Sequence, residues 1–201
     1  MRILMVGAGG VGSAAARIAA RRSFFASFVV TDYDQTRAAG VVADLADSRF
    51  TAAGVNAANV ADVERLAREH GATHVFNAVD PRFVLPVFNG ALAAGTDYLD
   101  TALSLSAPHP DRPYSEVEVK LGDEQFAAAG ECERRGRLAL LGIGVSPRAP
   151  GPAPQVLGPE RPGARPFLDK LVECGSPWGH REPQAGAPPG EHGGRRGAGP
   201  G

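Results

Sequence analysis

The feature that most constrains this sequence is a glycine motif that follows a short apolar run at the start of the chain. Residues 3–6, Ile-Leu-Met-Val, are typical of a buried parallel strand, and the alanine-rich residues 13–22 are typical of a helix. Strand, tight glycine turn and helix form the context in which G-x-G-x-x-G indicates dinucleotide binding. The motif comprises Gly7, Ala8, Gly9, Gly10, Val11 and Gly12.

The three glycines that define the G-x-G-x-x-G pattern each have a predicted role. Gly7 lets the chain turn sharply off the strand, and Gly12 lets the helix pack close to it. Gly9 has no Cβ, so a pyrophosphate can approach the backbone and rest on the unpaired N–H groups at the positive end of the helix.

Short apolar runs alternate with helical periodicity through residues 1–145, which indicates a parallel sheet covered on both faces. Because two strand–helix–strand–helix–strand halves follow one another, we predict an α/β fold with a doubly wound parallel sheet. This is the Rossmann arrangement, with strand order 3-2-1-4-5-6. After residues 3–6, we expect strands at residues 28–31, 50–55, 73–76, 97–100 and 137–142.

Most connections between these strands carry apolar residues at helical spacing. Helices are expected over residues 35–46, 60–70 and 81–94. Asn59 is placed to cap the second of them. The connection before the last strand is longer and contains three prolines, so we predict a polar loop over residues 104–115 and then a helix over residues 116–135, bent at Gly122.

Two charged residues after the second predicted strand bear on the choice of cofactor. Asp32 lies about 20 residues beyond the glycine motif, where an acid hydrogen-bonds the adenine ribose and repels a 2′-phosphate, which favours NAD over NADP. Its alternative role is that of a solvated turn acid. Arg37 keeps NADP open, because it can stack on adenine or pair with a 2′-phosphate. It can also be an exposed residue in the first turn of a helix.

Further candidate cofactor contacts follow the later strands. Asn56 follows the third strand, where an amide can read the adenine edge or simply form a turn. Asn77 and Ala78 follow the fourth strand at the topological switch point, where the nicotinamide-side ribose is expected. Asp100 ends the fifth strand, at the correct edge for a nicotinamide or substrate contact, with helix capping as its alternative role.

Composition excludes several classes of protein. The chain has 21 basic and 22 acidic residues and a formal net charge of −1, which gives no reason to expect nucleic acid or an anionic membrane as a partner. There is no signal peptide and no apolar stretch that could cross a bilayer, so we expect a cytoplasmic protein. The histidines and the two cysteines, Cys132 and Cys174, lack metal-ligand spacing, and we name no catalytic residue.

The composition changes abruptly near residue 146. Residues 1–145 hold 5 prolines and 14 glycines, whereas the 56 residues from 146 to 201 hold 12 of each. Such a segment cannot bury enough apolar surface to offset its chain entropy, so we predict a dinucleotide-binding domain over 1–145 and a disordered tail over 146–201. One hypothesis is that the tail is an out-of-frame translation of GC-rich DNA, which sequencing the gene would test. The other is a natural disordered segment.

Several stretches together resemble the saccharopine dehydrogenase family, in its NAD(P)-binding N-terminal domain. They are the glycine motif, the Asp32-Tyr33-Asp34 turn, Asn77-Ala78 before Pro81, and Tyr98-Leu99-Asp100-Thr101. The resemblance covers about residues 1–145. It implies an oxidoreductase that transfers hydride between NAD or NADP and the amine or imine carbon of a small amino-acid-like substrate. It is also compatible with a homodimer in full-length relatives.

In such relatives a substrate and dimerisation domain follows the sixth strand, and the resemblance stops where that domain would begin. We therefore expect weak dinucleotide binding and no full activity from this chain. The alternative function is an NAD-sensing regulatory module of the type that gates potassium uptake. Such modules also carry the glycine motif and an acid after the second strand, and they need no substrate domain.

Overall fold

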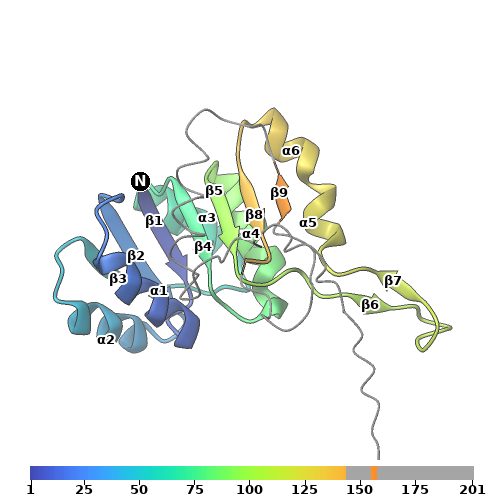
Figure 1. The fold of residues 1–201 in the computed structure, drawn as a ribbon, viewed down its shortest axis with the longest axis horizontal. Helices are drawn as coiled ribbons and strands as arrows, with labels where there is room; N and C mark the ends of the chain where they lie inside the picture. The colour runs from blue at the N-terminus through green and yellow to red at the C-terminus, as the bar shows by residue number, and fades with distance from the viewer. Residues whose placement is uncertain (144–154, 158–201) are drawn as a thin grey trace, which may run out of the picture.

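The computed structural model describes residues 1–143 and 155–157 of the 201-residue chain. Its main sheet has the strand order β3-β2-β1-β4-β5-β8-β9 (Figure 1). The first six strands in that order are parallel, and β9 pairs antiparallel with β8. The strands are β1 (Arg2–Val6), β2 (Ser27–Asp32), β3 (Phe50–Gly54), β4 (His74–Asn77), β5 (Asp97–Asp100), β8 (Ala139–Leu141) and β9 (Gln155–Leu157).

This topology confirms the predicted doubly wound Rossmann sheet, with β8 as its sixth parallel strand. The tail predicted to be disordered lies outside the described residues. The exception is the three residues of β9. The hypothesis that the tail is read out of frame concerns the same segment.

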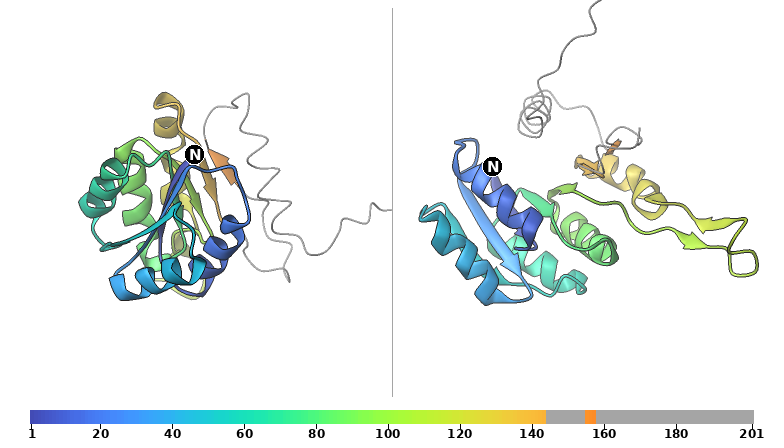
Figure 2. Two further views of the ribbon diagram at one scale, coloured as in Figure 1. Left: turned by 90° about the vertical axis from the view of Figure 1, so that its left-hand side faces the viewer. Right: turned by 60° about the horizontal axis from the view of Figure 1, so that its bottom comes forward.

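Helices cover both faces of the sheet, with α3 and α4 on one side and α1 on the other (Figure 2, left). They are α1 (Gly10–Ala20), α2 (Gln35–Leu45), α3 (Val60–Glu69), the 3-10 turn η1 (Pro81–Phe83), α4 (Val84–Ala94), α5 (Asp123–Ala127) and α6 (Ala129–Arg134). The predicted cap of α3 is present, because the Asn59 side chain accepts hydrogen bonds from the backbone N–H groups of Ala61 and Asp62.

Alternation along the strands divides the apolar side chains into two cores. Leu4, Val6 and Val75 belong to the core under α3 and α4. Ile3 and Met5 belong to the other core, which lies under α1 and α2. Successive side chains of a strand point to opposite faces, so a strand buried on both faces is apolar along its whole length, as residues 3–6 are.

The long connection between β5 and β8 differs from the prediction. Part of the predicted loop and the start of the predicted helix form an antiparallel hairpin, β6 (Ala107–Pro108) with β7 (Val117–Val119), that extends away from the sheet (Figure 1). The prediction of a helix from residue 116 was wrong because Glu-Val-Glu-Val-Lys-Leu has the two-residue period of a strand.

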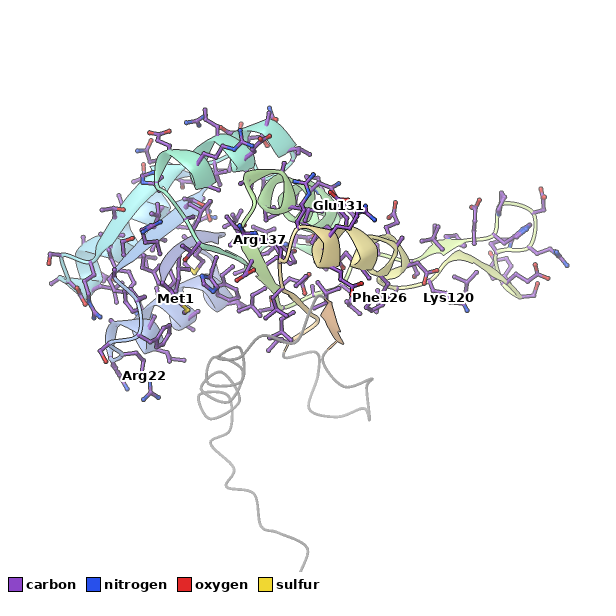
Figure 3. The ribbon with its side chains drawn as sticks, turned by 90° about the horizontal axis from the view of Figure 1, so that it is seen from above. Met1, Arg22, Lys120, Phe126, Glu131 and Arg137 are labelled. Carbon is purple, nitrogen blue, oxygen red and sulfur yellow. The ribbon has the colours of Figure 1, made fainter. Side chains whose placement is uncertain are left out.

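The helix that follows the hairpin starts late and is short. It begins at Asp123, after Gly122 has turned the chain with a φ of 85°. A Cβ on Gly122 would lie 2.7 Å from the ring of Phe126, which explains the glycine. In Figure 3, Lys120 marks the end of the hairpin and Phe126 marks α5.

Candidate functional site

The glycine turn joins β1 to α1 through two close approaches. Gly7 has a φ of +104°, and a Cβ there would lie 2.8 Å from the carbonyl oxygen of Ala78. A Cβ on Gly12 would overlap the carbonyl oxygen of Gly7. Glycine is therefore required at both positions, the first for conformation and close approach and the second for packing of the helix against the turn.

The N-terminus of α1 is open to solvent. Its N-cap residue is Gly9, which supplies no side chain to bond the free N–H groups of the first turn. A Cβ on Gly9 or on Gly10 would meet nothing within 4 Å, and both glycines and Val11 are exposed. These N–H groups can therefore receive an anion such as a pyrophosphate.

Asp32 connects the end of β2 to the glycine turn. Its Oδ2 accepts a hydrogen bond from the backbone N–H of Ala8 at 2.8 Å, and its Oδ1 accepts one from the N–H of Asp34 at 3.0 Å. Arg37 Nη1 lies 3.3 Å from the same Oδ1. Asp32 is 9% exposed, whereas the Arg37 side chain is 56% exposed. The pair thus places a buried carboxylate and an accessible guanidinium next to each other at the end of β2.

A groove of about 510 Å³ lies at the carboxyl ends of β1, β2, β3 and β4. Its predicted lining residues are Gly7, Gly9, Asp32, Arg37, Asn56 and Ala78. The sequence reasoning missed Val6, Tyr33, Val55, Ala57, Ala58, Val79, Asp80 and Phe83. Most of the missed residues lie within four residues after a strand end, and that position was the signal available to find them.

Asn56 shapes the part of the groove that follows β3. Its Oδ1 accepts a hydrogen bond from the N–H of Ala58, and its own N–H donates to Asp62 Oδ2 at 2.7 Å. That backbone hydrogen bond is the main cause that lowers the pKa of Asp62. Asn56 is thus part of a turn at the groove, and an adenine contact from it stays a prediction.

Asn77 and Asp100 lie outside the lining of the groove and are 1% and 0% exposed. The Asn77 amide bonds the hydroxyl of Tyr98 and the N–H of Val79. Asp100 accepts hydrogen bonds from Gln125 and from the N–H of Gly142. Both side chains are therefore bonded to protein groups, and a direct contact of either with a cofactor stays a prediction.

Burial shifts the pKa values of two residues of β5, Tyr98 and Asp100. Burial raises the pKa of Asp100, and the hydrogen bonds from Gly142, Gln125 and Tyr98 limit the rise. The pKa of Tyr98 is raised well above its usual value, first by burial and then by the charge of Asp100. At neutral pH Tyr98 is therefore a neutral hydroxyl.

Three other features were sought in the described residues: a metal site, a cysteine nucleophile and a membrane-spanning helix. Within residues 1–143 and 155–157, no three His, Cys, Asp or Glu side chains are grouped to hold a metal ion. Cys132 is buried, and burial raises the pKa of its thiol, so it does not suit a nucleophile. No helix in this part of the chain is long and apolar enough to cross a membrane.

Four features together define a dinucleotide-binding Rossmann domain. They are the glycine turn, the open N-terminus of α1, the acid after β2 and the groove at the switch point. Residues 3–140 match the family described as the saccharopine dehydrogenase NADP-binding domain. The chain belongs to this family, which confirms the predicted resemblance.

Individual relatives agree with this assignment. Carboxyaminopropylagmatine dehydrogenase from Synechocystis sp. is 29% identical over 150 residues, which are 75% of this chain and 36% of the relative. The fold is similar to that of saccharopine dehydrogenase (L-Glu forming) from Saccharomyces cerevisiae, with a TM-score of 0.53, 13% identity, and coverage of 71% of this chain and 27% of the other. The chain thus spans about a quarter to a third of the length of these relatives.

Proposed function

We propose that this chain binds NAD or NADP as the cofactor domain of an oxidoreductase. The reaction would transfer hydride between the nicotinamide and the amine or imine carbon of an amino-acid-like substrate. The observation that carries the proposal is the groove, which joins the open N-terminus of α1 to Asp32 and Arg37. The dehydrogenase names of the similar proteins support the reaction class. The cofactor would supply the hydride chemistry, and the protein would supply binding and orientation.

The groove suggests a place for each part of the adenosine half. The pyrophosphate would rest on the N–H groups that follow Gly9, and the ribose would lie at Asp32. Tyr33 lines the groove, as Asn56 does, and is 85% exposed, so its ring would be accessible for stacking on the adenine. Ala78 and Val79 would border the path toward the nicotinamide.

Arg37 is the residue that we propose to decide between the two cofactors. Asp32 alone would favour NAD, because its charge repels a 2′-phosphate. The guanidinium of Arg37 offsets that charge at 3.3 Å and lines the groove, so it can pair with a 2′-phosphate. We therefore expect the chain to accept both NADH and NADPH.

The test is a titration of the full chain with NADH and with NADPH, followed by nicotinamide fluorescence. Arg37→Ala should weaken NADPH binding about tenfold or more, because a charge-assisted pair is lost, and should change NADH binding less than about threefold. Arg17→Ala is the matched control, because Arg17 is 59% exposed, pairs with Asp44 and does not line the groove. If the chain binds neither cofactor at millimolar concentration, the proposed function is wrong.

A further inference from the structure

A series of buried and partly buried hydrogen bonds begins at the wall of the groove and runs along the carboxyl edge of the sheet. Val79, which lines the groove, donates its N–H to Asn77 Oδ1 at 3.1 Å. Asn77 Nδ2 donates to the Tyr98 hydroxyl at 2.9 Å. The Tyr98 hydroxyl also interacts with the Asp100 carboxylate, since each group shifts the pKa of the other. The loop after β4 is thereby connected to the last residue of β5.

From Asp100 the series continues to two further segments. Gly142, which follows β8, donates its N–H to Asp100 Oδ1 at 2.6 Å. Gln125 of α5 donates its Nε2 to Asp100 Oδ2 at 2.8 Å, and its Oε1 accepts the N–H of Ser104 at 2.8 Å. One carboxylate therefore holds the loops after β5 and β8 and the start of α5 in a single arrangement.

The arrangement has a fixed direction. Reversing the Asn77 amide would place its NH₂ group against the N–H of Val79, and reversing the Gln125 amide would do the same against the N–H of Ser104. Asp100 is the carboxylate acceptor on which the donors converge. A buried network that is satisfied in only one way rigidifies the groups that it joins.

The network also lies on one side of the proposed cofactor path. The adenosine half would occupy the groove over β1, β2 and β3, whereas ligands of doubly wound sheets cross the switch point toward the next strands. The nicotinamide half would therefore pass the loops that follow β4, β5 and β8. These are the loops that the network joins.

We infer that Asn77, Tyr98, Asp100 and Gln125 are positioning residues that fix the protein wall for the nicotinamide half. The inference rests on the proposed dinucleotide binding and adds to it a division of the site. The adenosine half would depend on the glycine turn, and the nicotinamide half would depend on this network. A purely structural network would instead affect both halves equally.

Tyr98→Phe separates these possibilities in the full chain. It removes one hydroxyl and keeps the ring, which packs edge-on against Phe88 with centroids 5.0 Å apart. We expect NADPH to bind about tenfold more weakly, as for the loss of one buried hydrogen bond, and adenosine 2′,5′-bisphosphate to bind within about twofold of wild type. The fluorescence maximum of bound NADPH should move toward that of free NADPH.

Gln125→Met is the second variant, because it keeps the length of the side chain and breaks the network far from the groove. It should also weaken NADPH selectively. Ser104→Ala is the matched control. Among the described residues the Ser104 hydroxyl is the one buried side-chain polar atom without a hydrogen-bond partner, so its loss should leave both ligands unchanged.

The outcomes distinguish the inference from the proposed function. Equal weakening of NADPH and the bisphosphate in Tyr98→Phe and Gln125→Met would mean a structural role and would overturn the inference. Unchanged NADPH affinity in both variants would overturn it as well, while the proposed function would stand. A wild-type chain that binds neither NADPH nor the bisphosphate would overturn both.

Discussion

The carboxyl edge of the sheet is held in different ways at its two ends. At β1 and β2 the donors are backbone N–H groups: that of Gly7 bonds the carbonyl of Thr31, and that of Ala8 bonds the Asp32 carboxylate. At β4, β5 and β8 side chains make the contacts, through Tyr98 and Asp100 among others. The first end therefore depends on glycines that allow the backbone to approach closely, and the second depends on the satisfaction of buried polar atoms.

This difference determines how each end responds to mutation. A backbone turn without Cβ atoms tolerates no added atom where segments touch, but it tolerates one that points into open space. A buried polar network responds instead to the loss of a donor or acceptor, and to pH where one member titrates. The predictions below test the two responses separately.

The largest effect is expected within the glycine turn. Gly12→Ala should destabilise the fold by at least about 3 kcal/mol, because the new methyl group would overlap the carbonyl oxygen of Gly7. Gly9→Ala should leave the free energy of unfolding within about 1 kcal/mol of wild type, because its Cβ meets nothing within 4 Å. It should still weaken NADPH binding about tenfold or more, because the methyl group would stand where the pyrophosphate is proposed to lie.

Urea unfolding and NADPH titration of both variants measure this contrast. Gly40→Ala is the control, since Gly40 lies in α2 and a Cβ there also meets nothing within 4 Å. It should stabilise the chain slightly, because alanine favours a helix. A Gly12→Ala variant as stable as wild type would contradict the steric account of the turn.

The same contrast decides what sequence reasoning could predict. The backbone-held end comes from local signals, such as the glycine spacing and the position of Asp32 after an apolar run. β5 was also predicted with its observed bounds, residues 97–100, because a short run after a helix stop at Gly95 is a local pattern. Gln125 was missed because it meets Asp100 across 25 residues of chain, and nothing near it in the sequence marks that contact.

The hairpin was missed for the opposite reason, because a local signal was present and was not followed. The alternation of Val117 and Val119 with charged residues was a local strand signal, but helical continuity toward residue 135 was favoured over it. Local pattern gave the right answer there, and the assumption of one long helix was wrong. The position of the groove followed from the topology, whereas the partners of the buried polar groups required the structure.

An intermediate effect is expected at Asp100. Asp100→Asn replaces an acceptor by an NH₂ group that faces a donor, so it should cost about 1–3 kcal/mol of stability near neutral pH. Burial raises the pKa of Asp100 in the folded state, so the folded chain keeps this proton to higher pH than the unfolded chain does. The contribution of Asp100 to stability therefore falls as the pH rises through and above its ordinary value of 3.8.

The prediction for Asp100 is thus a difference that depends on pH. The stability gap between wild type and Asp100→Asn should be larger near pH 4.5 than near pH 7, as measured by urea unfolding at both values. Contributions from the other carboxyl groups cancel in the difference. A gap that widens as the pH rises would mean that the hydrogen bonds from Gly142 and Gln125 outweigh burial, and would contradict the raised pKa.

The smallest effect is expected for the hairpin. It lies in the β5–β8 connection, which also contains Ser104 and Gln125 of the network, but it makes few contacts with the sheet. β6 and β7 pack mainly on each other, and Leu105, Val117 and Leu121 are each about half exposed. Replacing residues 108–117 with Asn-Gly, which favours a tight two-residue turn, should change the free energy of unfolding by less than about 1 kcal/mol. Ser104 and Gln125 would keep their hydrogen bond, so NADPH affinity should also be unchanged. A loss of several kcal/mol on urea unfolding would show that the hairpin supports the polar network.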